Sequence, residues 1–293
     1  MITKISNDQI TFVSESRNVE PRMLRFNDED VNYFWLPPGG EPLGAAICFP
    51  TLGTLPDFRY HLNGKWYHMD MHGFAKDFDY EVKAGTDSVV YELRDNSQTR
   101  AQYPYAFRFQ VAYSVRGNEF ITEYRVHNPN DTDLPFSVGG HPRFSCPMDV
   151  SSGLTFEDYY LEFESPECIE NIIKSYGPVE KIAKYLSEDG LRLALNDEMF
   201  EKGCFCFSPF HSKRATLRSK RSTRSITMSA PTVTHFQLWK AVGEQFLALE
   251  PWYGSITSVP PREEECDWIA RPGTIFLAPG EEFTCSYSVH IDR

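Results

Sequence analysis

The 293-residue sequence lacks the short motifs that mark several common enzyme classes. It has no G-x-G-x-x-G fingerprint and no P-loop, which argues against dinucleotide-binding and nucleotide-hydrolysing sites of those kinds. It has no H-E-x-x-H pair, and isolated histidines and glutamates are weak grounds for a zinc site. A G-x-S-x-G nucleophile elbow is also missing, which argues against a serine hydrolase. We therefore expect no cofactor and no metal.

The sequence is also poor in basic charge and in long apolar runs. Its 29 basic and 41 acidic residues give a net charge of -12, which disfavours nucleic acid and anionic membranes as partners. No apolar run approaches membrane-spanning length, and residues 1–18 contain no apolar segment typical of a signal peptide. The seven cysteines follow no disulfide framework, so we expect reduced thiols. These features predict a soluble, cytoplasmic protein, and they do not indicate its oligomeric state.

Alternating apolar residues, many of them aromatic, are what the sequence has in abundance. Residues 107–126 read as two strands joined at Gly117-Asn118, and residues 283–291 repeat the same alternation after a Pro279-Gly280 turn. Helical patterns are few: one short helix is expected within 178–187 and one capped turn over 196–203. Without a βαβ rhythm, the pattern predicts an all-β fold, a large antiparallel β-sandwich formed by a single domain over residues 1–293.

Two of the eight histidines have unusual neighbours. His141 lies in "FSVGGHPRFSCP", where Pro142 favours extended backbone and the two preceding glycines allow another group to approach closely. His72 lies in "MDMHGFAKDF", between a polar segment and an expected strand. Either imidazole could serve only local backbone groups, but the Gly-Gly-His-Pro setting favours a chemical role for His141.

Glu250 continues the apolar face of a strand in "LALEPWYG". Period two places it in line with Phe246 and Ala248, where a carboxylate is costly to bury unless it is paired or used. Partial burial would raise its pKa towards neutrality, which suits a general base. Trp252 would then offer an apolar plate of the kind that packs against a sugar ring. The alternative is a glutamate at a strand end that faces water.

Two other features have mainly structural interpretations. Cys204 and Cys206 in "GCFCF" share one strand face and are expected to be small core residues. The basic stretch 212–224 is expected to be a solvated hairpin face, with a phosphate site that uses Arg218 and Arg221 as a minority alternative.

Three motifs together give the sequence a resemblance to a known family. "MHGFAKD", "SVGGHPRFSCP" and "LALEPWYG" resemble, in order and spacing, the aldose 1-epimerase (galactose mutarotase-like) superfamily, and "FPTLGTL" at 49–55 resembles its LacX-like branch. The resemblance spans nearly the whole chain. It implies a galactose mutarotase-like supersandwich with a sugar site in a groove on one concave sheet.

The resemblance also implies roles for individual residues. His141 would be the general acid at the ring oxygen, and Glu250 the general base at the anomeric hydroxyl. His72 would hydrogen-bond the sugar, and Lys76 stands where relatives commonly carry an arginine that contacts the ligand. Gln237, one expected strand before the acid, either lines the groove or is an ordinary hairpin residue.

Three positions depart from the pattern of the family. Thr54 stands where relatives often have arginine, Gly203 aligns with their aspartate, and Lys76 cannot reproduce the bidentate fork of arginine. The changes at Thr54 and Gly203 favour a binding protein without turnover, whereas the presence of both His141 and Glu250 favours a cofactor-independent isomerase that interconverts the anomers of an aldose, with a small sugar as its partner. The alternatives are a catalytically idle carbohydrate-binding or sensing protein and a hexose-6-phosphate 1-epimerase.

Overall fold

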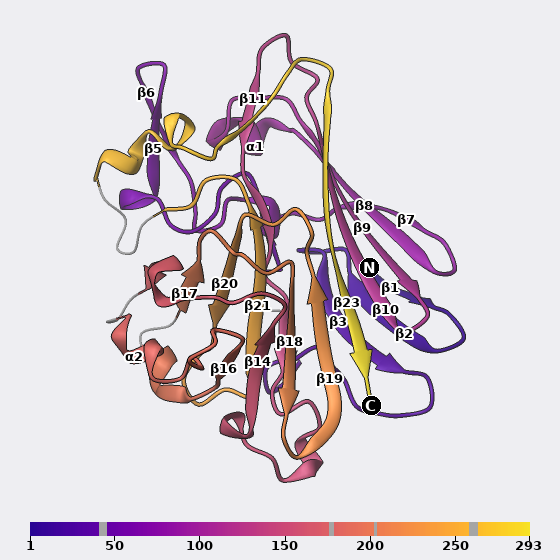
Figure 1. The fold of residues 1–293 in the computed structure, drawn as a ribbon. Helices are drawn as coiled ribbons and strands as arrows, with labels where there is room; N and C mark the ends of the chain where they lie inside the picture. Colours follow the sequence, from indigo (N-terminus) through magenta and orange to yellow (C-terminus); the bar gives the residue numbers. More distant parts are fainter. Residues whose placement is uncertain (41–45, 176–178, 202–203, 258–262) are drawn as a thin grey trace.

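In the computed structural model, antiparallel β-sheets dominate the chain (Figure 1). The structure describes residues 1–40, 46–175, 179–201, 204–257 and 263–293. Within these ranges there are two short α-helices, α1 (Ser97–Gln102) and α2 (Glu180–Ala183). The remaining helical segments are single 3-10 turns, as for η6 (Asp197–Phe200).

A nine-stranded antiparallel sheet forms one layer, and its strands β18, β19, β23 and β10 lie side by side in Figure 1. In sheet order its members are β16 (Arg192–Ala194), β14 (Tyr159–Phe163), β18 (Arg214–Ser219), β19 (Ser222–Ser229), β23 (Glu282–Asp292), β10 (Glu119–His127), β9 (Arg108–Arg116), β8 (Ser88–Arg94) and β7 (Glu81–Ala84).

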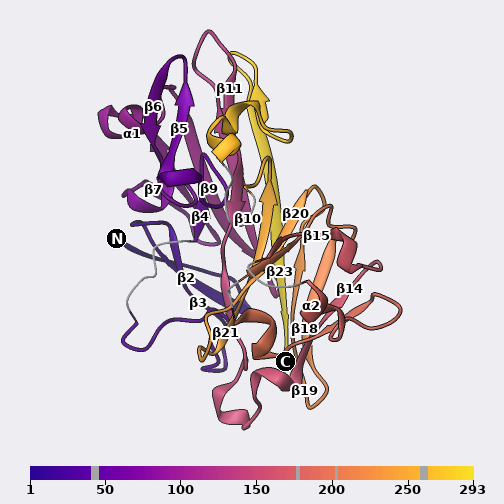
Figure 2. The ribbon, with the colours of Figure 1, turned by 90° about the vertical axis from the view of Figure 1, so that its left-hand side faces the viewer.

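A second large sheet carries the two motifs around His141 and Glu250. In sheet order its members are β15 (Ile172–Ser175), β17 (Cys204–Phe207), β20 (His235–Trp239), β21 (Phe246–Tyr253), β12 (Val138–Gly140) and β4 (Ile47–Cys48), with β13 (Arg143–Ser145) also paired to β21. Figure 1 shows β20 and β21 next to each other, and Figure 2 gives the same ribbon turned by 90°.

Three smaller sheets complete the fold. They are β1 (Ile2–Ser6), β2 (Ile10–Glu15) and β3 (Glu20–Phe26); β5 (Arg59–Leu62) with β6 (Lys65–His68); and β11 (Leu134–Phe136) with β22 (Ile275–Leu277).

Aromatic side chains fill the space between the two large sheets. Phe163 of β14 and Phe207 of β17 have ring centroids 5.5 Å apart, and Phe49 stacks on Phe109 of β9 at 4.5 Å. One buried apolar cluster runs from residues of β1 to residues of β23. Burial of this apolar surface is the main stabilising contribution to a fold of this kind. The face of the β20–β21 sheet that points away from this core carries Gln237 and Glu250.

The structure confirms the expected all-β sandwich, and most expected strands lie where the alternation placed them. The hairpin over 107–126 forms as β9 and β10, joined at the Gly117-Asn118 turn with Arg116 opposite Glu119. Helix α1 was not expected, although Asn96 caps it in a capping box with Thr99. Of the expected turn over 196–203, η6 forms behind its Asn196 cap, and Gly203 lies outside the described residues. That one domain spans the chain stays a prediction.

The structure also bears on the expectations about thiols and membrane-spanning segments. All seven cysteines lie in the described ranges, and none of them forms a disulfide bond. Cys204 and Cys206 are buried on β17, as expected of core residues. No helix among the described residues is both long and apolar enough to cross a membrane.

Candidate active site

Three side chains from three neighbouring strand segments meet in one row across the second large sheet. Gln237 of β20 lies directly opposite Glu250 of β21. On the other side of β21, Gly139 pairs with Trp252 and Arg143 pairs with Ala248, so the same register places His141 opposite Glu250. Residues far apart in sequence are thus brought together by strand pairing.

Two prolines interrupt the ladder at this row. Pro142 and Pro251 have no backbone N–H to donate, and β12 and β13 are separate strands on either side of the gap. Leu249 N still donates to Pro142 O at 3.3 Å, which holds His141 against β21. The alternative that Glu250 is a strand-end residue facing water is wrong, because β21 continues through Pro251 to Tyr253 and Glu250 is buried.

The acid and the imidazole of this row are in direct contact. His141 Nε2 lies 3.4 Å from Glu250 Oε1, and Gln237 Nε2 donates to Glu250 Oε2 at 3.2 Å. Glu250 has no exposed surface, while His141 is 6% and Gln237 3% exposed. The pair therefore lies below the protein surface, and a ligand that reaches Glu250 has to displace side chains that cover it.

His72 joins this row from a different part of the chain. Its backbone has a φ of +64°, and Gly53 N donates to its Nδ1 at 3.1 Å. When the ring is neutral, its proton is therefore on Nε2. The ring centroid lies 5.5 Å from that of His141 and 5.5 Å from that of Trp252. The structure thus brings His72 to the same place as His141 and Glu250.

Trp252 does not offer the open apolar plate that the sequence suggested. Its side chain is completely buried and packs with Cys48 and Leu52 as well as with His72. Trp239 is instead partly exposed, and its ring lies 5.4 Å from that of His141. Trp239 is therefore the better-placed ring to face a ligand.

The two glycines before His141 serve packing on opposite faces of the sheet. A Cβ on Gly139 would lie 2.5 Å from Trp252 Cδ1, and one on Gly140 would lie 2.9 Å from the Tyr124 hydroxyl in the inter-sheet core. The close approach expected from the sequence does occur. The groups that approach are core aromatics of the protein itself.

Lys76, the remaining expected ligand contact, lies beside its sequence neighbour. Its Nζ pairs with Asp77 Oδ2 at 2.7 Å, and its side chain is 14% exposed. Thr54 follows Gly53, the residue whose backbone N–H donates to His72. It brings no charge to this segment, where relatives often have arginine.

Arg143 and Trp239 belong to the site face but were not singled out from the sequence. Both follow a named residue by two positions, Arg143 after His141 and Trp239 after Gln237, and two residues along a strand return to the same face. Ala248 lies between them in the next row of the sheet. Period two, applied to the neighbours of His141 and Gln237, would have found both.

The basic stretch 212–224 forms the β18–β19 hairpin on the other large sheet. Arg218 pairs with Glu162 at 3.1 Å and Arg221 with Asp158 at 3.1 Å. Arg214 and Arg224 also have carboxylate partners, Glu164 and Glu29. The hairpin expected from the sequence is present, and its arginines are neutralised by acidic neighbours.

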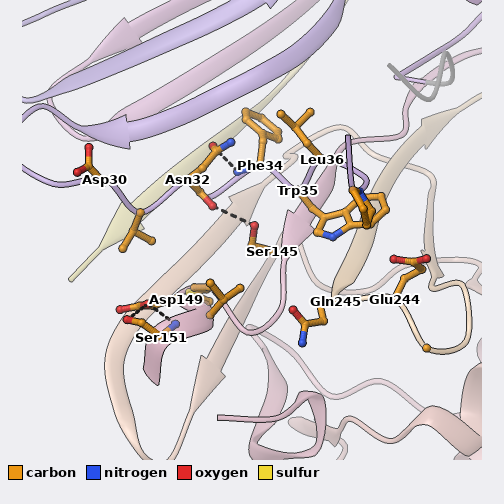
Figure 3. A pocket seen from close by; sticks show the side chains of 15 residues that line it. Asp30, Asn32, Phe34, Trp35, Leu36, Ser145, Asp149, Ser151, Glu244 and Gln245 are labelled. Carbon is orange, nitrogen blue, oxygen red and sulfur yellow. Dashed lines mark hydrogen bonds between the residues drawn. The ribbon is translucent and has the colours of Figure 1, made fainter. Parts of the chain in front are cut away.

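A hollow of about 760 Å³ lies beyond the end of the same sheet face (Figure 3). It is lined by Trp35 and by Ser145, which is two residues beyond Arg143 on β13. Ser145 Oγ donates to the carbonyl of Asn32 at 2.9 Å within it. The hollow therefore lies two residues further along the face than the row of Arg143, and its lining does not include His141 or Glu250.

Comparison with known proteins gives this geometry a context. Residues 48–290 match the sequence model of the family described as aldose 1-epimerase. The plasmid and chromosomal LacX proteins of Lactococcus lactis subsp. lactis are each 26% identical over 277 residues, which covers 88% of this chain and 90% of theirs.

Solved structures resemble the fold over its whole length. A galactose mutarotase related enzyme from Lactobacillus acidophilus is 25% identical, with a TM-score of 0.86 over 100% of this chain and 98% of its own. A galactose mutarotase-like protein from Lactobacillus casei is 24% identical, with a TM-score of 0.84 over 100% of both chains. The family match spans most of the sequence and includes the strands that carry His141 and Glu250, so this chain belongs to the aldose 1-epimerase family, in its LacX-like branch.

Proposed function

We propose that the protein is an isomerase that interconverts the α and β anomers of an aldose by opening and reclosing the sugar ring. The observation that carries the proposal is the contact between His141 and Glu250, 3.4 Å apart below the protein surface. An imidazole and a carboxylate are the pair of side chains best suited to exchange protons near neutral pH. Their convergence from separate motifs is difficult to explain by packing alone, because buried ionisable groups are costly.

The reaction needs one base and one acid at neighbouring atoms. Glu250, ionised, takes the proton of the anomeric hydroxyl O1 while the C1–O5 bond breaks and C1=O1 forms. Protonated His141 gives its proton to O5. The aldehyde turns about the C1–C2 bond, and ring closure on the other face returns both protons. O1 and O5 share the carbon C1, so an acid and a base must act side by side, as His141 and Glu250 are placed. This sequence of proton transfers requires no cofactor.

The remaining residues are assigned to binding. His72, with its proton on Nε2, donates to a sugar hydroxyl. Gln237 fixes the Glu250 carboxylate through the 3.2 Å hydrogen bond, and Trp239 faces the C–H surface of the sugar. Trp252 packs against His72. Lys76, which pairs with Asp77, is assigned to ligand contact on the resemblance to the family alone.

The test is a direct assay of anomer exchange. The protein is incubated with freshly dissolved α-glucose or α-galactose, and the approach to equilibrium is followed by optical rotation or anomer-resolved NMR. We expect equilibration faster than in buffer alone for at least one aldose of a broad panel. Equilibration at the buffer rate for every aldose of the panel would refute the isomerase function.

The complete burial of Glu250 favours one alternative, a carbohydrate-binding or sensing protein without turnover. In that case a sugar would occupy the outer part of the site, on the partly exposed Trp239, and leave Glu250 covered. Sugar binding observed by NMR titration without any acceleration of anomer exchange would support this second function.

A further inference from the structure

Arg143 is a buried cation on the face of the sheet that carries the candidate acid and base. It is the first residue of β13, lies opposite Ala248 of β21, and is 7% exposed. Glu250 is two residues from Ala248 on β21, and His141 is two residues from Arg143. All of them therefore share one face of the sheet. The guanidinium lies 5.5 Å from the centroid of the Trp239 ring, in the space that the small Ala248 leaves above the strand.

The contacts of Arg143 within the protein use few of its hydrogen-bond donors. Its Nη1 lies 3.7 Å from Glu20 Oε1, a separation longer than a normal hydrogen bond. Its Nε is buried with no hydrogen-bond partner among the described residues. A guanidinium has five N–H donors, and leaving the one on Nε buried without a partner is unfavourable. Burial lowers the pKa of Arg143, while the charges of Glu20 and Glu250 raise it.

The ion pair has the shape of a receptor for a hydroxyl group. A sugar hydroxyl donates one hydrogen bond and accepts others, so it fits between a donor and an acceptor that do not bond each other. Arg143 and Glu20 border a void of about 10 Å³ together with His141, and about this much space holds one water molecule. A ligand hydroxyl placed there could accept a hydrogen bond from Arg143.

The row spacing of the sheet places this receptor within reach of a sugar bound at His141. Side chains two residues apart on one face of a strand are separated by about 7 Å. An aldose whose C1 lies against His141 and Glu250 therefore has its distant ring hydroxyls over the row of Arg143, Ala248 and Trp239.

We propose that Arg143, held by Glu20, binds a ring hydroxyl remote from C1 of the aldose. This inference rests on the proposed function, because it takes C1 to lie at His141 and Glu250.

The experiment measures binding of the sugar favoured by the full-length protein and of its monodeoxy analogues, by NMR titration. The variants are Arg143→Gln, the charge-balanced double variant Arg143→Gln/Glu20→Gln, and Arg218→Gln as the matched control on the β18–β19 hairpin. We expect the wild type to bind one particular deoxy analogue about 10- to 100-fold more weakly than the parent sugar, as for loss of a hydrogen bond to a charged group. Arg143→Gln should weaken the parent by a similar factor and bind that analogue and the parent equally. The double variant should behave in the same way, while Arg218→Gln should match the wild type.

Several outcomes would overturn the inference. An equal loss for the parent and every analogue in both Arg143 variants would mean that Arg143 acts on the structure of the site. Unchanged binding in the double variant would also refute the inference. Failure of the proposed function is a separate result, in which the wild type binds sugars without accelerating anomer exchange. A wild type that binds no sugar refutes both.

Discussion

His141 Nε2 lies 3.4 Å from Glu250 Oε1, although the two residues come from motifs more than a hundred positions apart in the chain. The contact follows from strand pairing, since the register on both sides of the row aligns the two residues. It makes the pair a single unit, in which a change to one group alters the charge beside the other. The first prediction concerns this unit.

Replacing either member of the pair should slow anomer exchange without unfolding the protein. Glu250→Gln keeps the size of the side chain and an oxygen for the Gln237 N–H, and it removes the base. His141→Asn removes the acid. Each variant should lower the rate by at least about 100-fold, the usual contribution of a positioned acid or base. Polarimetry on freshly dissolved α-anomer measures the rate.

The double variant is the control for this pair. Because His141 and Glu250 act in one step, removing both should cost little more than removing one. Losses that multiply in the double variant would mean that the two residues contribute independently, contrary to the mechanism.

Most of the fold could be predicted from the sequence because its signals are local. Alternation over 107–126 and 283–291 places the apolar side chains on one face, and a turn signal separates the strands of the hairpin. The acid and the imidazole were found for another reason: Glu250 extends an apolar face where a charge is costly, and His141 sits between glycine and proline.

What the sequence could not give was the depth and neighbourhood of each group. The burial of Trp252 depends on Cys48 and Leu52, which come from another part of the chain. The Arg143–Glu20 pair joins β13 to β3, and no local pattern links those two strands. The continuation of β21 past Pro251 could not be predicted either. Proline has no backbone N–H to donate to a neighbouring strand, so a proline normally argues against a central strand at that position.

Gln237 should affect the rate and its pH dependence more than the stability. Its Nε2 donates to Glu250 Oε2 at 3.2 Å, and a donor of this kind favours the ionised carboxylate. Gln237→Leu should therefore lower the rate by about 10-fold or more and move the acid limb of the rate profile to higher pH. Anomer-exchange rates over a pH series measure both effects. A Gln237→Leu profile that keeps its shape and falls evenly at all pH values would contradict this role.

Gly139 should be intolerant of a side chain. A Cβ at this position would meet Trp252 Cδ1 at 2.5 Å, and Trp252 is enclosed by other buried groups. Gly139→Ala should lower the free energy of unfolding by about 1–3 kcal/mol, as overpacking does. Gly85→Ala is the matched control, because its Cβ would meet atoms only at 3.4 Å. Urea unfolding of the two variants measures the difference, and equal stability would show that Trp252 has room to move.

The arginines of the β18–β19 hairpin should not select phosphosugars. Arg218 and Arg221 are neutralised by Glu162 and Asp158 at 3.1 Å each. Arg218→Ser together with Arg221→Ser should leave the ratio of rates on glucose and glucose 6-phosphate unchanged. If the wild type prefers the phosphosugar and the double variant loses that preference, the hexose-6-phosphate 1-epimerase alternative is correct instead.

Mild acid should destabilise the fold through His235. This histidine of β20 donates from Nε2 to the carbonyl of Gly254 at 2.8 Å, and its Nδ1 lies 2.7 Å from Ser208 Oγ. Burial lowers the pKa of His235 below its usual 6.5. In acid the unfolded chain therefore takes up a proton before the folded protein does, and the neutral imidazole stabilises the fold above about pH 6.5.

That contribution is lost as the pH falls from about 6.5 towards the lower pKa of the folded state. The carboxylates whose pKa is lowered, such as Glu92 and Asp149, titrate in more acidic solution and do not interfere at about pH 5 and above. Urea unfolding at about pH 7.5 and pH 5 should show a loss of stability in the wild type and a smaller loss in His235→Gln. The variant should start from a lower stability, because it gives up hydrogen bonds to Ser208 and Gly254. Equal pH dependence in the two proteins would mean that His235 titrates alike in the folded and unfolded states, and that its burial has no energetic consequence.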